Sequence, residues 1–294
     1  MKLSYDGRAF RGDTPEAPAP STATIQAFGL TGYYGGITPV LLPQTSWQDD
    51  VVASVARIGP DLVAEDFETE PGTLPGWDGP SNPSAMYVSG GRSYSGVRSL
   101  ELGYGAGASG VGYAYRHFAR QERVYVRWFQ RWSANFVWAA WSTSLIALRP
   151  SSTYPHFYPL ISGSDNSFVV QAQVLADRQW GSENFFQNVG EPFALEPERW
   201  FCFEVMVQLN TPGQTDGVLA AWIDDQPKLL YEGRAFRGAS EGDPSPASAR
   251  LSQLLVLGQY SGPATVPHFQ ISWQDDLIVS PQRVGCHAPA RTVR

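Results

Sequence analysis

The chain carries its own ending a second time near its beginning, and this repeat limits its possible folds more than any other feature. Residues 2–12 read KLSYDGRAFRG and residues 228–238 read KLLYEGRAFRG, an offset of 228 − 2 = 226 positions. The same offset carries SWQDDVVAS, residues 46–54, onto SWQDDLIVS, residues 272–280. A single register over roughly 58 residues indicates an internal repeat. The chain is therefore one full unit preceded by the end of another.

This repeat predicts the domain organisation. Residues 1–60 form a partial copy of 227–286, residues 61–286 form the complete unit, and residues 287–294 form a C-terminal tail. The partial copy has too little core and too many open strand edges to be stable alone. It either packs on its own domain or completes a sheet of another subunit. The residues expected to mediate this packing or assembly are Tyr5, Arg8, Phe10, Trp47, Asp49 and Asp50.

Short segments of alternating polar and apolar residues predict strands. Each segment is rich in β-branched or aromatic residues and is bounded by turn formers. No stretch has a sustained helical period with caps. The pattern predicts an all-β protein, a sandwich or a barrel. The clearest segments are 123–132, 167–176, 199–209, 217–225, 250–260 and 268–280.

Charge and hydropathy exclude two classes of partner. The net charge of −7 disfavours nucleic acid, which basic surfaces bind. No apolar run is long enough to span a membrane, and the first residues lack the apolar core of a signal peptide. The two cysteines, Cys202 and Cys286, leave open whether a disulfide forms.

Three segments resemble the concanavalin A-like lectin/glucanase superfamily, and within it the polysaccharide-lyase-like modules. AEDFETEPGTLPGW (64–77) resembles their opening strand, 198–226 their central hairpin, and FQISWQDDLIVS (269–280) their closing strand. The resemblance implies a jelly roll of two antiparallel sheets, one of them concave and often holding a glycan. It does not specify a function, because this fold serves lectins, hydrolases, lyases and spacers.

One segment offers the groups that a lyase acting on a uronic-acid polymer needs. Such an enzyme neutralises the substrate carboxylate, removes the adjacent proton and protonates the leaving oxygen. In RPSSTYPHFYPL, Arg149 is the candidate neutraliser, and Tyr154, His156 and Tyr158 are candidate bases and acids. The alternative interpretation, which we favour from the sequence, is a proline-containing aromatic loop with a surface histidine.

Glycoside hydrolysis requires two carboxylates facing one cleft. The adjacent pairs Asp224–Asp225 and Asp275–Asp276 are expected to point to opposite faces of a strand, which favours structural roles. The four histidines have no metal-ligand spacing, so we expect no metal and no cofactor. Ca²⁺ at an aspartate-rich turn remains an alternative.

Tryptophans are candidates for contacts with sugar rings or with a partner protein. An aromatic face stacks on the apolar side of a sugar, but a buried core position is the explanation we favour for any single tryptophan. The candidates are Trp138, Trp141 and Trp180.

These observations together favour a non-enzymatic structural protein of a larger assembly. The partial repeat and the missing signal peptide point to a virion component, for capsid decoration or in a tail. Its expected partners are copies of itself or other virion proteins, with glycan adhesion as a further role. The alternative is a secreted, extracellular polysaccharide lyase or lectin-like protein.

The partial repeat yields a first prediction. If residues 1–60 dock on a neighbouring subunit, the intact chain should oligomerise and a chain lacking them should be a folded monomer. Light scattering of both chains measures this difference. Two monomers would show instead that the repeat packs within its own chain.

Overall fold

The computed structural model describes residues 61–151, 153–163, 165–176 and 179–286, with the side chains of 175–180 left out. Within residues 1–60 it describes only an antiparallel pair, β1 (Ser4–Tyr5) and β2 (Arg8–Ala9), in which Tyr5 faces Arg8 along the backbone. The chain divides into two units, Met1–Gly59 and Pro60–Arg294. The remaining repeat positions, Phe10, Trp47, Asp49 and Asp50, and the tail 287–294 lie outside the described residues.

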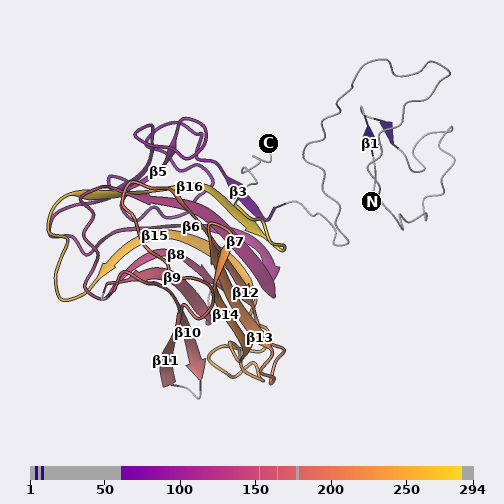
Figure 1. The fold of residues 1–294 in the computed structure, drawn as a ribbon. Coiled ribbons are helices and arrows are strands. Elements are labelled where there is room, and N and C mark those ends of the chain that lie inside the picture. The colour runs from indigo at the N-terminus through magenta and orange to yellow at the C-terminus, as the bar shows by residue number, and fades with distance from the viewer. Residues whose placement is uncertain are drawn as a thin grey trace, which may run out of the picture. The chain divides into compact units, whose positions relative to one another are not determined.

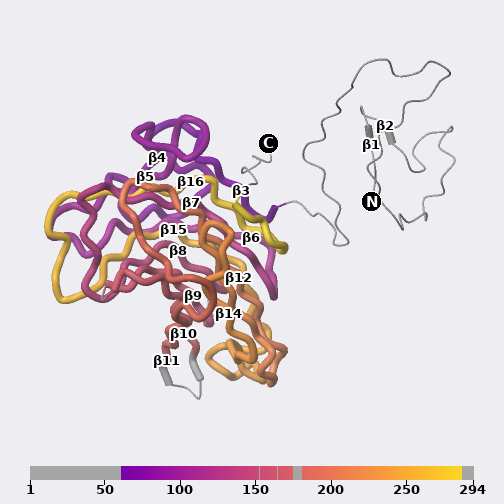
Figure 2. Tube along the Cα trace, viewed as in Figure 1, coloured from indigo at the N-terminus to yellow at the C-terminus, as the bar shows by residue number. Residues whose placement is uncertain are grey.

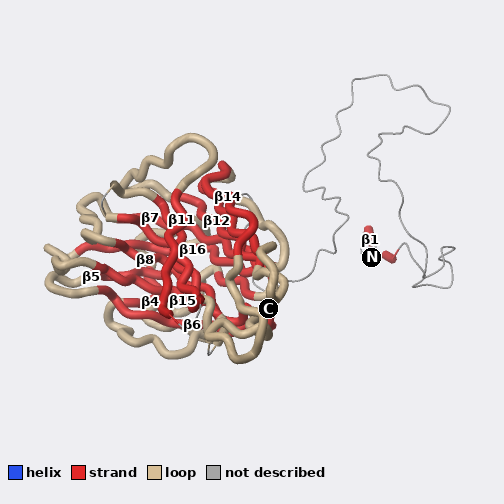
Figure 3. Tube along the Cα trace, turned by 90° about the horizontal axis from the view of Figure 1, so that it is seen from below, coloured by secondary structure: helices blue, strands red, loops and turns tan. Residues whose placement is uncertain are grey.

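The second unit is a sandwich of two antiparallel sheets, which confirms the predicted all-β class (Figure 1). Strands and loops make up its described residues, without a helix (Figure 3). The six-stranded sheet has the order β11 (Gln179–Phe186), β10 (Phe168–Ala176), β9 (His156–Ser162), β8 (Ser142–Arg149), β15 (Leu251–Ser261), β6 (Gly110–Gln121). The eight-stranded sheet has the order β14 (Gln226–Arg234), β13 (Gly217–Ile223), β12 (Phe201–Gln208), β7 (Arg123–Trp132), β16 (Gln270–Ser280), β5 (Ser99–Tyr104), β4 (Met86–Ser89), and β3 (Val63–Glu65) also pairs with β16.

The beginning and the end of this unit meet in one sheet. Strand β3 runs antiparallel to the second half of β16, with Ala64 opposite Ile278 (Figure 2). The other edge of β16 pairs with β7 along most of its length. The closing segment is therefore central to the sheet, and nearly all of its side chains are buried.

All six segments singled out by alternation form strands: β7, β10, β12, β13, β15 and β16. The alternation did not reveal β9, because this segment contains Pro159 and resembles a loop. Pro159 is tolerated there because the β8–β9 ladder is interrupted between the pairs Ser144–Leu160 and Leu148–Phe157. A proline, which lacks an N–H group, is accommodated where a ladder is irregular.

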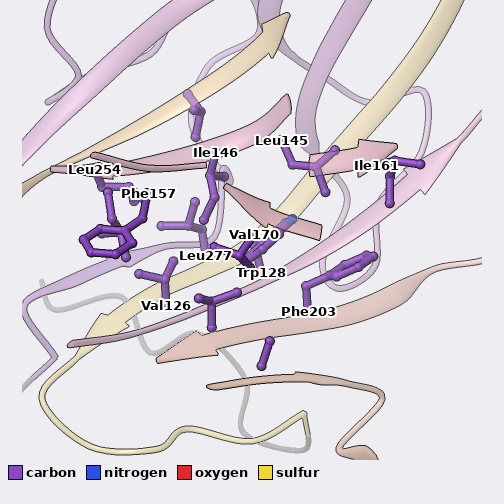
Figure 4. Packing of buried hydrophobic residues seen from close by; sticks show 14 of the residues in the cluster. Val126, Trp128, Leu145, Ile146, Phe157, Ile161, Val170, Phe203, Leu254 and Leu277 are labelled. Carbon is purple, nitrogen blue, oxygen red and sulfur yellow. The ribbon is translucent and has the colours of Figure 1, made fainter. Parts of the chain in front are cut away.

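The core lies between the two sheets and is built from the inward side chains of both. Figure 4 shows Ile146, Phe157 and Val170 from the six-stranded sheet facing Trp128 and Phe203 from the other. The rings of Trp128 and Phe203 stack with centroids 5.3 Å apart. Burying one such side chain stabilises the fold by roughly 1.5–3 kcal/mol.

The aspartate pair of β16 departs from simple alternation. Asp275 accepts hydrogen bonds from the backbone N–H groups of Tyr94 (2.7 Å) and Ser95 (3.2 Å), while Asp276 accepts one from the Ser95 hydroxyl (3.0 Å). Both carboxylates thus reach the same loop, so the expectation that they point to opposite faces is wrong. The reason is a bulge: Asp276 has a φ of 46°, and the register with β7 shifts after Asp275.

Asp224 and Asp225, in contrast, are not strand residues. Both have positive φ, 51° and 62°, and form the turn of the hairpin between β13 and β14. Two successive positive φ angles are the geometry that a tight hairpin requires. Their carboxylates accept hydrogen bonds from the backbone N–H groups of Cys202 (2.9 Å) and Cys286 (3.2 Å), so they fasten this turn to the start of β12 and to the segment after β16.

Cys202 and Cys286 form a disulfide, with their Cα atoms 5.8 Å apart. The bond joins the start of β12 to the segment that follows β16. It closes a loop with a sequence separation of 84 residues.

No helix among the described residues is long and apolar enough to cross a membrane.

Removing this disulfide should destabilise the sandwich. In the chain-entropy model a loop of this length contributes about 4.5 kcal/mol. We expect the Cys202→Ala/Cys286→Ala variant to unfold at a lower urea concentration, with an m-value at least as large as that of the intact chain because its unfolded state is less compact. The intact chain, measured with and without a reductant, is the control; an unchanged midpoint in reductant would contradict the prediction.

Candidate functional site

A cluster of polar side chains lies on the outer face of the six-stranded sheet. Leu148 of β8 and Phe157 of β9 are paired and belong to the core, so their neighbours point the other way. Those neighbours are Arg149, His156 and Tyr158. A small apolar cluster separate from the main core, formed by Ala147, Leu255 and Leu257, lies on this outer face. Tyr115 and Tyr158 pack against it.

Register extends the cluster across the sheet. Gln253 of β15 lies between His117 of β6 and Arg149 of β8. His156 of β9 pairs with Gln173 of β10. We call this line of residues, completed by Ser182 of β11, the arginine row: His117, Gln253, Arg149, His156, Gln173 and Ser182.

Hydrogen bonds hold the guanidinium of Arg149 in place. Its Nε donates to Oε1 of Gln253 at 2.6 Å, and Nε2 of Gln253 lies 3.3 Å from Nε2 of His117. Gln253 is 3% exposed, so this support is buried. No further hydrogen bond joins the terminal nitrogens of Arg149 to a residue that the structure describes. These nitrogens form the fork that binds a carboxylate through two parallel bonds.

The hydrogen bonds of His156 define its tautomer. Nε2 lies 3.1 Å from the carbonyl oxygen of Thr153, which only accepts, so Nε2 carries the proton. In the neutral ring Nδ1 is then an acceptor. The hydroxyl of Tyr158 lies 3.2 Å from Nδ1 and donates to it. The pair is a phenol whose proton already points at a base.

The pKa shifts of the pair favour the uncharged form of both groups. Burial and, to a lesser extent, the positive charge of Arg149 lower the pKa of His156 to about 4. Burial raises the pKa of Tyr158, although Arg149 acts in the opposite direction. Near neutral pH the imidazole is therefore uncharged and able to accept a proton, and the phenol still holds its own. Perturbed groups of this kind concentrate at functional sites.

Tyr154 acts on the orientation of His156. Its ring stacks on the imidazole with centroids 4.3 Å apart and an interplanar angle of 27°. The peptide bond between Tyr154 and Pro155 is cis. The structure thus gathers the four candidate lyase residues, Arg149, Tyr154, His156 and Tyr158, at one place.

The three tryptophan candidates lie in different surroundings. Trp138 is partly buried against the core, with its ring centroid 4.9 Å from that of Trp132 and 4.7 Å from that of Phe136. Trp141, immediately before β8, is 69% exposed. Trp180 lies in β11 opposite Leu175, and its side chain is outside the described residues. A contact with glycan or a partner stays a prediction for all three.

The sequence interpretation missed Gln253 and His117. Gln253 lies in the segment 250–260, which is predicted to be a strand, but neither residue has a motif around it. A signal was present for Gln253, a polar residue inside the apolar run RLSQLLVLGQY. Its meaning depends on β8, which lies beside it in space and 104 residues away in sequence.

Within the described residues, no group of three or more histidine, cysteine, aspartate or glutamate side chains is arranged to hold a metal ion. The expectation of no cofactor and the alternative of Ca²⁺ both stay untested. The arginine row instead offers a cation, Arg149, and a neutral base, His156, and Tyr158 beside them offers a phenol. Those are groups for binding an acid and moving a proton.

Comparison with solved structures identifies the fold. An endo-β-1,4-glucuronan lyase from the fungus Trichoderma reesei matches 79% of this chain and 98% of its own, with a TM-score of 0.57 and 13% identity. The alginate lyase vAL-1 from Chlorella virus matches 68% of this chain and 90% of its own, with a TM-score of 0.54 and 14% identity.

A mutant of alginate lyase Aly36B, solved in complex with an alginate trisaccharide, matches 76% of this chain and 99% of its own, with a TM-score of 0.56 and 13% identity. No family model matches the sequence, and neither does any curated protein. At these identities the likeness concerns the fold. The second unit has the concanavalin A-like jelly-roll architecture of polysaccharide lyases, as the sequence resemblance implied.

The geometry of His156 predicts how it titrates. Its folded-state pKa of about 4 lies below the ordinary value of 6.5, so the neutral form stabilises the fold. This stability is fully present above pH 6.5 and is lost as pH falls toward 4. Long-range ¹H–¹⁵N spectra should show a neutral ring protonated at Nε2 at pH 7. The Arg149→Gln variant should have a higher His156 pKa, because a nearby positive charge is removed. A His156 pKa near 6.5 in the intact chain would contradict the prediction.

Proposed function

We propose that this chain is a polysaccharide lyase that cleaves a uronate-containing polymer by β-elimination. The observation that carries the proposal is the arrangement of Arg149, His156 and Tyr158 on the outer face of the six-stranded sheet. A cation, a neutral base and a phenol lie together there, as β-elimination requires. The shared fold with lyases supports the proposal, but residue chemistry decides it.

Arg149 is the group that binds the substrate carboxylate. In β-elimination the proton beside the carboxyl group becomes removable only if the developing negative charge on that group is stabilised. The bond from Nε to Gln253 fixes the plane of the guanidinium and leaves its terminal nitrogens for two parallel bonds to the carboxylate. Gln253 thus acts through Arg149 as a positioning residue.

Tyr158 and His156 move the proton. Tyr158 gives its hydroxyl proton to Nδ1 of His156 while its oxygen takes the proton from the sugar carbon next to the carboxyl group. The electron pair of that C–H bond forms the new C=C bond, and the bond to the glycosidic oxygen breaks. Tyr158 then protonates the leaving oxygen and recovers its own proton from His156. The reaction consumes neither water nor an oxidant.

The disulfide supports an extracellular location in this proposal. Disulfides persist in oxidising surroundings, and a polymer-degrading enzyme meets its substrate outside the cell. A virion role and self-association were predicted from the partial repeat. The comparisons offer no support for a virion protein, so that role stays a prediction about residues 1–60.

The decisive test is a Tyr158→Phe variant assayed on a panel of uronate polymers. Loss of a group that transfers protons should reduce the formation of unsaturated product about 100- to 10,000-fold. Absorbance of the unsaturated uronate measures this rate. The matched control is Tyr125→Phe, on the other sheet, where the ring stacks on Trp222 with centroids 6.3 Å apart.

Two results would overturn the proposal. One is a Tyr158→Phe variant as active as the wild-type chain. The other is the absence of unsaturated product from every polymer with a chain shown to be folded by its circular dichroism. If the folded chain bound a polymer without cleaving it, the chain would be a lectin-like protein instead.

A further inference from the structure

The outer face of the six-stranded sheet carries a second line of residues beside the arginine row. Tyr158 pairs with Gln171 of β10, which pairs with Asn184 of β11. On the other side Leu255 of β15 pairs with Tyr115 of β6. We call this line the tyrosine row: Tyr115, Leu255, Ala147, Tyr158, Gln171 and Asn184.

The two rows hold one permanent positive charge. Strand β6 has two other arginines, but Arg116 pairs with Glu65 at 2.9 Å and Arg120 donates to the carbonyl of Ser248 at 2.9 Å. Both alternate with His117 along the strand and so belong to the opposite face. Arg149 is therefore the single lysine or arginine in either row, and both rows consist entirely of described side chains.

Neutral amides and hydroxyls occupy the rest of both rows on β10 and β11. Gln171 donates from Nε2 to Oδ1 of Asn184 at 3.0 Å, and Gln173 and Ser182 lie beside them in the arginine row. The one carboxylate of β11, Glu183, belongs to the opposite face, where it pairs with Arg234 at 3.1 Å. Amides and hydroxyls both donate and accept, which suits sugar hydroxyl groups.

A polymer with a carboxylate on every sugar does not fit this charge pattern. One carboxylate would bind Arg149, but its neighbours along the chain would lie over neutral side chains of a protein whose net charge is −7. A desolvated charge without a partner is costly, and a negative protein repels a polyanion at long range. A carboxylate flanked by neutral sugars avoids both costs.

We infer that the substrate is a heteropolysaccharide in which each uronate is separated from the next by neutral sugars. Arg149 selects the uronate, and the amides of β10 and β11 bind the neutral unit next to it. This inference rests on the proposed function, because it takes Arg149 as the carboxylate site. It goes further in that it names the class of polymer.

The test compares two kinds of polymer with the full chain. Hyaluronan and heparosan, in which glucuronate alternates with N-acetylglucosamine, represent the first kind. Polyglucuronate and polymannuronate, in which every sugar is a uronate, represent the second. We expect cleavage and binding to favour the alternating polymers at least tenfold, and binding to weaken only slightly with added salt because one charge pair is formed.

A gain of charge on β10 makes the test sharper. Gln173→Lys adds a cation next to His156 in the arginine row, and a partly exposed ion pair of this kind should improve the relative binding of polyglucuronate about threefold to fivefold. Gln214→Lys, in the exposed hairpin between β12 and β13, makes the same change in net charge elsewhere. It should leave the ratio between the two kinds of polymer unchanged.

The outcomes separate this inference from the proposed function. Cleavage that favours polyglucuronate or polymannuronate would overturn the inference and leave the lyase intact. Tight binding of the alternating polymers without cleavage would overturn the lyase and support the specificity. An equal effect of Gln173→Lys and Gln214→Lys would show that the row does not select charge. Binding of no polymer would overturn both.

Discussion

The packing of Leu148 and Phe157 in the core determines where the functional groups lie. These two residues are directly paired on β8 and β9, and both are fully buried. Since side chains alternate along a strand, burying them places Arg149, His156 and Tyr158 on the outer face. The hydrophobic effect that closes the sandwich thus also aligns the groups proposed for catalysis. A shift of one residue in either strand would exchange the two sets.

The chemistry of the site depends on partial burial. His156 is neutral near pH 7 because its surroundings disfavour charge, and the carbonyl of Thr153 leaves Nδ1 free to accept from Tyr158. A fully solvated histidine would be partly protonated at mildly acidic pH, and the protonated fraction could not accept a proton. The hydrogen bond from Arg149 to Gln253 restrains the guanidinium. It costs little additional side-chain entropy, because Gln253 is already buried in β15.

The buried acids of the eight-stranded sheet have structural roles, unlike the polar residues around Arg149. Asp275 and Asp276 hold the loop that contains Tyr94 and Ser95. Burial and the adjacent charge of Asp276 raise the pKa of Asp275 to about 7, although the hydrogen bonds from Tyr94 and Ser95 act in the opposite direction. These acids are bound to backbone N–H groups and hydroxyls within the chain. They lie on a different sheet from Arg149, so they take no part in the proposed reaction.

The sequence by itself determined the all-β class, the six alternating strands and the lyase-like jelly roll, because a period of two and turn residues are local properties. It also placed Arg149, Tyr154, His156 and Tyr158 in one short segment. Only the tertiary structure decided that this segment enters a strand rather than a loop, since the interruption that accommodates Pro159 is a property of β8 and β9 together. The tertiary structure likewise decided three other features: the Arg149–Gln253 hydrogen bond, the bulge at Asp276 and the Cys202–Cys286 disulfide. Each depends on residues far apart in the chain, so no local sequence pattern predicts it.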